Sequence, residues 1–392
     1  MLPPMSEQTV ELGRGTGPLR GVKVVEIAGI GPGPHACMIL ADLGADVIRV
    51  ERPGGQMLAG GATMTLNRGR PSVALDLKNP EAVSTVLELV RHADVVVEGM
   101  RPGVTERLGL GPDDCLAVNP RVVYGRMTGW GQTGPLAHAA GHDMNYIAIT
   151  GALHMMGQTP DRPQFPANLV GDFGGGSTYL VIGVLAALLE ARLSGEGQVV
   201  DAAIVDGTAH LNAMTAAFAA SGGWKEERGA NLLDGGVPYY DIYETSDGRH
   251  MSVGALEPQF FDALVTLLGV KETCPGQGDM DRYDEMRAVF TETFKQRTQA
   301  EWVELFEGTD ACVAGIVPFS QAVHHPHLTA RGTFVDHAGQ VQPAPAPRFS
   351  RTGATLGMPP SATAGEHTRD ALTAWGVDDV DGLIERGVAV QA

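Results

Sequence analysis

Short apolar segments alternate with longer segments of helical periodicity over the first third of the chain. The apolar segments expected to form strands are residues 23–28, 46–51, 72–76, 94–98 and 122–126. Between them, Leu and Val recur every three or four residues, which predicts helices over residues 34–43, 80–92 and 104–118. Such alternation is typical of a parallel sheet covered by helices, so we expect a Rossmann-like α/β domain here.

The pattern changes in the middle of the chain. Residues 179–193 are apolar on nearly every side of a helix, which predicts a helix buried on most sides, and a further helix is expected over 201–220. Residues 239–243 and 250–253 predict a hairpin, with helices over 259–268 and 282–294 after it. The expected parts are an N-terminal extension at 1–17, a large Rossmann-like domain at 18–225, a small α+β domain at 226–331, and a C-terminal segment at 332–392 that returns to the large domain.

Length and charge limit the classes of protein that fit. The chain has 392 residues, 43% of them hydrophobic, which is enough for two or three packed domains. Its 46 acidic residues against 28 Lys and Arg give a net charge of −18, so its surface repels nucleic acid and anionic lipid. The longest apolar stretch, residues 179–189, is shorter than the ~20 residues that a membrane-spanning helix needs. With four scattered cysteines, we expect a cytoplasmic protein without a nucleic-acid or membrane partner.

A glycine-rich segment at residues 29–34 follows the first predicted strand, and Glu51 lies about twenty residues further on, as in a dinucleotide-binding fingerprint. Pro34 occupies the third glycine position of that fingerprint, and Pro32 and Pro34 both lack the backbone N–H that would bind phosphate. The sequence therefore disfavours a nicotinamide cofactor, although this turn still suits a non-redox nucleotide.

Two other familiar site types find no support. His324, His325 and His327 lie in a proline-containing loop with no nearby Cys or carboxylate, so we interpret them as solvated surface and expect no metal. The chain also contains neither a Gly-x-Ser-x-Gly elbow nor a P-loop, so serine hydrolysis and ATP chemistry lose their usual motifs.

Three titratable residues stand near glycines where an apolar run begins or ends: His142, Asp172 and Glu257. Each is placed to project from the end of an element into a cleft, where acid–base catalysts act. Each also has a structural interpretation. His142 would begin a helix beside a capping Asp143, Asp172 would be a helix N-cap, which stabilises a helix by about 1 kcal/mol, and Glu257 would be a first-turn acid. Spacing alone leaves both interpretations open.

Arginines gather behind two predicted strands. We place Arg49, Arg52, Arg68 and Arg70 just after the second strand, and Arg101 and Arg107 after the fourth. In a doubly wound sheet these positions lie near the carboxyl ends of the strands, where ligands bind. Six guanidinium groups at one edge of an acidic protein predict a small polyanionic ligand with phosphate contacts, and solvated surface arginines are the alternative.

Several longer segments carry a resemblance to a known family. They are GPGPHACMILADLGADVIRVERPG, NRGRPSVALDLK, VEGMRPGVTERLGLGP, MTGWGQTGP, AGHDMNYIAITG, NLVGDFGGGS, GQVVDAAIVDG and GALEPQF. From about Pro18 to the C-terminal helix, the chain resembles family III CoA-transferase-fold proteins and, among them, the α-methylacyl-CoA racemases. The resemblance implies an interlocked homodimer whose active site lies between the large domain of one chain and the small domain of its partner. It implies an acyl-CoA substrate and no separate cofactor, because coenzyme A is part of that substrate.

The resemblance also assigns roles to residues. His142, helped by Glu257, would act on one face of the substrate α-carbon and Asp172 on the other, because inversion needs a base on each face. Backbone N–H groups such as that of Asp143 would stabilise the enolate oxygen, each contributing about 3 kcal/mol. The positions implied for binding coenzyme A are Arg52, Leu75, Asp76, Leu77, Lys78, Gly99, Met100, Arg101, Arg107, Gly141, Asp143, Met144, Asn145 and Tyr146.

The chain departs from its relatives at two of these segments. Met100 stands where many relatives have an aromatic residue, and Pro71 follows Arg70 where a second basic residue is common. The alternative function is a CoA-transferase in which Asp172 acts as nucleophile and forms acyl-enzyme and CoA-thioester intermediates. That chemistry would leave His142 without a role, and GALEPQF replaces the glycine-rich loop that transferases close over their intermediate.

Overall fold

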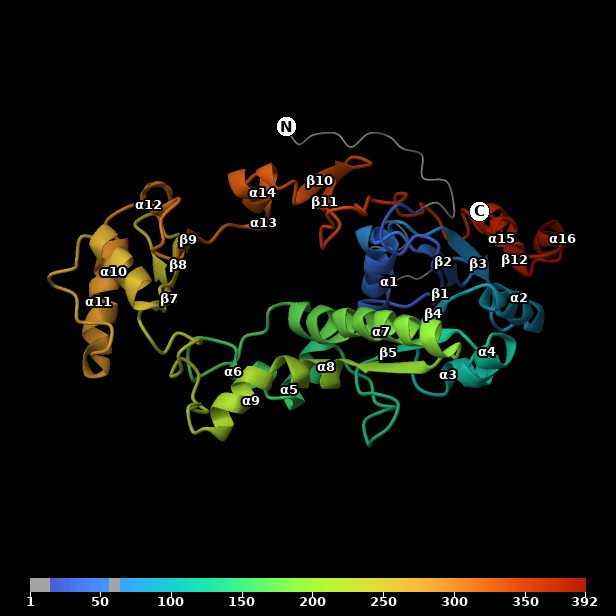
Figure 1. Cartoon of the computed structure of the whole chain (residues 1–392), viewed down its shortest axis with the longest axis horizontal. Coiled ribbons are helices and arrows are strands. Elements are labelled where there is room, and N and C mark those ends of the chain that lie inside the picture. The colour runs from blue at the N-terminus through green and yellow to red at the C-terminus, as the bar shows by residue number, and fades with distance from the viewer. Residues whose placement is uncertain (1–14, 56–63) are drawn as a thin grey trace. The chain divides into compact units, whose positions relative to one another are not determined.

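The computed structural model describes residues 15–55 and 64–392 of the chain. The chain divides into two compact units (Figure 1). The large unit comprises the described part of Met1–Thr150 together with Pro166–Leu211 and Pro326–Ala392. The small unit comprises Gly151–Phe165 and Asn212–His325, so both of its segments are inserted into the large unit.

The large unit is built on a seven-stranded sheet. Its strands, in spatial order, are β12 (Ala389–Val390), β3 (Ser72–Leu75), β2 (Asp46–Glu51), β1 (Lys23–Ile27), β4 (Val95–Glu98), β5 (Val123–Thr128) and β6 (Val199–Ala203). All neighbours from β3 to β6 pair in parallel, and β12 is antiparallel to β3. The order 3-2-1-4-5-6 is the Rossmann order, which confirms the predicted architecture and all five predicted strands.

Helices cover both faces of this sheet. The helices of the large unit are α1 (Pro32–Asp42), α2 (Pro80–Arg91), α3 (Val104–Leu108), α4 (Pro112–Val118), α5 (Asp143–Ile149), a π-helical segment η3 (Leu169–Ser177), α7 (Thr178–Ser194), α8 (Ile204–Leu211), α14 (Pro326–Ala330), α15 (Thr368–Ala374) and α16 (Val380–Glu385). A short helix η2 (Thr65–Asn67) and a hairpin of β10 (Phe334–His337) and β11 (Gln340–Pro343) complete the unit.

Two predicted helices are wrong in extent. The helix expected over residues 104–118 is two helices, because Gly109 ends α3 with a left-handed φ of 75° and Pro112 begins α4. The helix expected over 201–220 is β6, α8 and α9 (Ala213–Ala220). The apolar segment at 199–204 continues directly into α8, so its hydrophobic pattern alone did not separate the strand from the helix.

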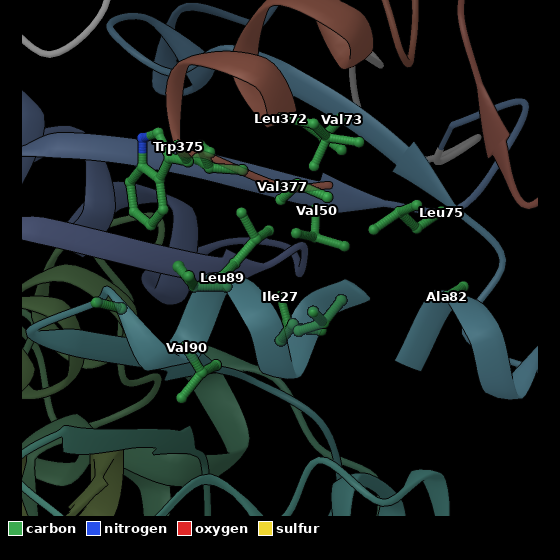
Figure 2. Packing of buried hydrophobic residues seen from close by; sticks show 14 of the residues in the cluster. Ile27, Val50, Val73, Leu75, Ala82, Leu89, Val90, Leu372, Trp375 and Val377 are labelled. Carbon is green, nitrogen blue, oxygen red and sulfur yellow. The ribbon is translucent and has the colours of Figure 1, made fainter. Parts of the chain in front are cut away.

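The C-terminal segment completes the core on one face of the sheet. Leu372, Trp375 and Val377 pack against β2, β3 and α2, where Val50, Val73 and Leu89 are buried (Figure 2). The Trp375 indole N–H also donates to a carboxylate oxygen of Asp46 across 3.0 Å. On the other face, residues of α1 and α7, including Leu40, Leu180 and Val184, cover Val24, Val47 and Val97.

Helix α7 is only partly buried, contrary to the prediction. The helix lies beside β5 (Figure 1). Leu180 and Val184 pack on the sheet, whereas Ile182, Leu189 and Leu193 are exposed, Leu193 at 83%. The continuous helical run Leu169–Ser194 is long and apolar enough to cross a membrane by length and composition alone. Its buried side is occupied by the sheet, which is the arrangement of a core helix in an α/β domain.

The small unit has an antiparallel sheet of β7 (Tyr240–Glu244), β8 (His250–Gly254) and β9 (Val313–Gly315). The predicted hairpin is confirmed, and β9, a strand of three residues, was not predicted. Its helices are α6 (Ala152–Met155), α9, α10 (Pro258–Leu267), η4 (Met280–Arg282), α11 (Tyr283–Phe294), α12 (Gln299–Phe306) and α13 (Phe319–Ala322). Aromatic residues such as Phe290, Phe294 and Trp302 form the core, so this unit is α+β as expected.

Candidate active site at the carboxyl edge of the large sheet

The carboxyl ends of the parallel strands bring several predicted positions to one edge of the sheet. Arg52 follows β2, Asp76 follows β3 and Gly99 follows β4, and all three are exposed. Strand order reverses at β1, which lies between β2 and β4. In doubly wound sheets the crevice beside such a switch point is where ligands bind.

Asp172 lies within η3, the π-helical segment that leads directly into α7. Its half-buried carboxylate accepts a hydrogen bond from the side-chain amide of Asn168 across 3.1 Å and makes no helix cap. The interpretation of Asp172 as an N-cap is therefore wrong. π-Helical turns are rare in proteins, and those that occur are often found at functional sites.

The glycines around Asp172 allow η3 to pack unusually close to its neighbours. A Cβ on Gly175 would lie 2.6 Å from the backbone nitrogen of Thr208 in α8, and one on Gly171 would lie 2.7 Å from Cγ of Asp143. A Cβ on Gly207 of α8 would overlap the carbonyl oxygen of Gly175. The run of glycines in GDFGGG thus serves close packing of backbone segments, which sets the position of Asp172.

His142 is the residue before α5, and its exposed imidazole makes no capping hydrogen bond. Instead, the side-chain oxygen of Asn145 accepts from the His142 backbone N–H across 3.1 Å. The neighbouring Asp143 is buried, and its Oδ2 accepts from the backbone N–H of Asp172 across 2.7 Å. Asp143 is therefore not the helix cap that the sequence suggested, and it joins the two segments that carry His142 and Asp172.

The glycine-rich turn after β1 also reaches this site. Gly31 has a φ of 68°, and a Cβ on it would lie 3.4 Å from Oδ2 of Asp172. The segment that the sequence compared with a dinucleotide fingerprint therefore lies beside the Asp172 carboxylate. Sequence reasoning did not connect Gly31 with Asp172, because nothing in the pattern shows which strand end faces η3.

The surroundings of Asp172 raise its pKa above the ordinary value of 3.8. Burial is the main cause, and the negative charge of Asp143 acts in the same direction. The hydrogen bond from Asn168 and the charge of His142 oppose the shift. The pKa of the Tyr146 hydroxyl is also raised, by burial and by the charge of Asp172. These effects favour the protonated carboxyl relative to an exposed aspartate.

His35 is a site residue that the sequence analysis missed. Its Nδ1 lies 2.6 Å from Oγ of Ser177, and its ring lies 4.3 Å from the ring of Phe173, the neighbour of Asp172. Burial, with the charges of Arg68 and Arg70, lowers the pKa of His35 from 6.5 to about 4. A neutral imidazole therefore fastens η3 to α1. The only sequence signal was its place one residue beyond the glycine-rich segment.

The turn from Gly99 to Arg101 is organised by a buried carboxylate. Glu98 accepts from the Met100 backbone N–H across 2.6 Å and from Nε of Arg126 across 2.9 Å. Arg126 continues to Glu106 of α3 across 2.8 Å. This network holds the segment that leads to Arg101, whose side chain is exposed, as is that of Arg107.

The remaining predicted coenzyme A positions lie in two further turns. Leu75 ends β3, and the Asp76 side chain accepts from the backbone N–H of Lys78 across 3.1 Å, which shapes the turn that also contains Leu77. Tyr146 donates its hydroxyl hydrogen to the Gly141 carbonyl and stands edge-on to Trp130. Met144, the second residue of α5, is exposed.

Three of the six arginines that suggested a polyanion site have another use. Arg49, Arg68 and Arg70 are buried. Arg49 pairs with Glu51 across 3.2 Å, Arg68 with Asp42 across 2.5 Å, and Arg70 with Glu26 across 2.5 Å. Because these guanidinium groups are already matched by carboxylates inside the protein, the predicted cluster of six is reduced to the exposed Arg52, Arg101 and Arg107.

Glu257 belongs to the small unit, whereas His142 and Asp172 belong to the large unit. It precedes α10 at the N-cap position with an extended backbone, is exposed, and makes no side-chain cap.

In the part of the chain that the structure describes, no three His, Cys, Asp or Glu side chains are grouped so as to hold a metal ion.

Comparison with known proteins identifies the family of this chain. Residues 19–368 match the family model for CoA-transferase family III. The chain is 43% identical to alpha-methylacyl-CoA racemase of Mus musculus and 42% identical to that of Homo sapiens, in each case over 91% of this chain and 93% of the relative. The crystal structure of a CAIB/BAIF family protein from Brucella suis is similar with a TM-score of 0.78 and 29% identity, covering 92% of this chain and all of that one. The chain therefore belongs to CoA-transferase family III.

Proposed function

We propose that this chain is a racemase that interconverts (2R)- and (2S)-2-methylacyl-CoA thioesters by moving the α-proton. The observation that carries the proposal is the hydrogen bond from the Asp172 amide to Asp143, which joins an imidazole-bearing turn to a carboxylate-bearing turn at the carboxyl edge of the sheet. Similarity to alpha-methylacyl-CoA racemases over 91% of the chain supports the reaction type.

Two proton transfers make up the reaction. In one direction the Asp172 carboxylate removes the proton from C2 of the substrate, and the electron pair of the C–H bond moves into the thioester to give an enolate. The His142 imidazolium then gives a proton to the opposite face of C2. The enzyme is left with a protonated Asp172 and a neutral His142, which is the state required for the reverse inversion.

The enolate oxygen needs hydrogen-bond donors, and the backbone N–H groups at the start of α5, such as that of Asp143, are our candidates. The coenzyme A moiety would lie along the same edge of the sheet. Arg52, Arg101 and Arg107 are exposed there, as is Lys78, and such cations suit its phosphate groups. The scheme needs no cofactor besides the coenzyme A of the substrate.

The scheme also assigns Glu257 to assist His142 from the small unit of a partner chain in an interlocked homodimer. Exposed apolar surface supports such an assembly. In α9, which is composed of AMTAAFAA, no residue is buried, and α7 exposes Ile182, Leu189 and Leu193. The assembly predicts a solution mass of twice 41.2 kDa by light scattering.

The deciding experiment follows deuterium and stereochemistry together. Each enantiomer of a 2-methylacyl-CoA ester is incubated with the protein in D₂O. We expect both to reach the same mixture of enantiomers and to carry deuterium at C2. No inversion and no deuterium uptake across a panel of acyl chains would overturn the proposal. If hydroxylamine instead traps an acyl group on Asp172 when a carboxylic acid acceptor is present, the transferase alternative gains the support.

A further inference from the structure

Asp143 is a buried carboxylate, and the proton-transfer scheme gives its side chain no chemical step. The residue is 5% exposed. Oδ2 accepts from the Asp172 backbone N–H across 2.7 Å, and Oδ1 is buried without a hydrogen-bond partner within the described part of the chain. Burial of a carboxylate with a single hydrogen-bond donor costs free energy, so the position of this group calls for an explanation.

The packing around Asp143 shows what its side chain does. The carboxylate fits against Gly171, where any Cβ would come within 2.7 Å of Cγ of Asp143. Its oxygen thus reaches the backbone of η3 at the residue that carries the catalytic carboxylate, rather than a side chain that is free to turn. Its own backbone is bonded directly to His142, which precedes α5. A single residue therefore spans the two segments.

We propose that Asp143 is a positioning residue whose side chain fixes the backbone of Asp172 relative to His142, so that the two bases flank one carbon. This inference rests on the proposed racemase function. A displacement of about 1 Å between reacting groups can lower a rate about a hundredfold, so one hydrogen bond at this place has leverage on turnover. Because the bond does not involve the substrate, its loss lowers kcat more than it changes KM.

The test compares Asp143→Ala, which removes the acceptor, with Asp143→Asn, which keeps an acceptor oxygen of the same reach. The matched control is Asp113→Ala, since Asp113 is an exposed first-turn acid of α4, a helix that packs on α2. For each protein we measure kcat and KM for inversion, the thermal midpoint, and hydrogen–deuterium exchange of the peptide that contains the Asp172 amide.

We expect Asp143→Ala to lose at least about tenfold in kcat with KM changed by less than about threefold, and to lose protection of the Asp172 amide. Asp143→Asn should restore both amide protection and most of kcat, and Asp113→Ala should match the wild type. A folded Asp143→Ala protein with wild-type kcat and a protected Asp172 amide would overturn the inference, as would equal losses of kcat in the Asn and Ala variants.

Two further outcomes are also informative. If Asp143→Ala does not fold, Asp143→Ser takes its place, because its hydroxyl keeps the site polar but stops one bond short, and wild-type kcat in that variant overturns the inference. If the wild type neither inverts nor exchanges its substrate, the proposed function fails. Exchange at the Asp172 amide then still decides the link: faster exchange in Asp143→Ala supports it, and unchanged exchange overturns it.

Discussion

The side-chain amide of Asn168 donates to Oδ2 of Asp172 across 3.1 Å. This is the same carboxylate oxygen that a Cβ on Gly31 would approach. This bond stabilises the ionised carboxylate and lowers the pKa of Asp172 against the effect of burial. Asn168→Leu should therefore raise the pKa further. Asp172 must be ionised to remove the proton from the enantiomer on its own side. For that enantiomer, the acidic limb of the kcat–pH profile should move to higher pH. An acidic limb at the wild-type position would show that this bond does not tune the base.

Replacement of either base should stop inversion while leaving traces of half the reaction. In Asp172→Asn, His142 remains able to exchange the proton on its own face, and in His142→Ala, Asp172 does the same on the other face. Deuterium uptake without inversion, measured separately from each enantiomer, should therefore favour opposite enantiomers in the two variants. Full inversion by either variant would contradict the assignment of two bases.

Neutral His35 should make the stability of the large unit depend on pH. Its pKa falls from 6.5 to about 4 on folding, so the unfolded chain takes up the proton first as the pH drops. The folding stability that neutral His35 contributes is fully present above pH 6.5 and is lost as the pH falls from 6.5 toward 4. His35→Asn keeps a donor near Ser177 but does not titrate, so its urea midpoint should change less than that of the wild type between pH 7 and pH 4.5. Equal changes in both proteins would rule out His35 as the source.

Gly207→Ala should destabilise the protein strongly. A Cβ on Gly207 overlaps the Gly175 carbonyl oxygen, so α8 and η3 must separate to admit one methyl group. We expect a loss of about 3 kcal/mol, at the upper end of overpacking effects, together with reduced kcat because η3 carries Asp172. Gly278→Ala is the control, since Gly278 has open space at its Cβ and no left-handed φ. Urea unfolding of both variants checks the prediction, and equal midpoints would contradict it.

The sheet was predictable because its central strands are buried on both faces and therefore appear as continuous apolar runs. The strand β12 escaped prediction because it has two residues, and β6 because its apolar residues continue into α8. His142 and Asp172 could be singled out, yet the sequence did not show that the side chain of Asp143 binds the Asp172 backbone.

The arginines illustrate the limit of sequence patterns more generally. Arg49 lies within β2, and Arg70 lies two residues before β3. The sequence analysis expected both near ligand phosphates. Whether such a side chain turns inward depends on buried carboxylates such as Glu26, which is distant in sequence. The register of β1 with β2 places Arg49 opposite Glu26, and the same carboxylate also pairs with Arg70. Local periodicity contains no information on either contact.

The inserted position of the small unit has a consequence for synthesis on the ribosome. Every residue of that unit has been translated by His325, whereas the core of the large unit still lacks Leu372 and Trp375 and the edge strand at Ala389. The nascent N-terminal sheet therefore keeps part of one apolar face uncovered until these later residues emerge. On a ribosome stalled between His325 and Leu372, the small unit is fully translated and the large unit is not. The C-terminal segment therefore completes the large unit last.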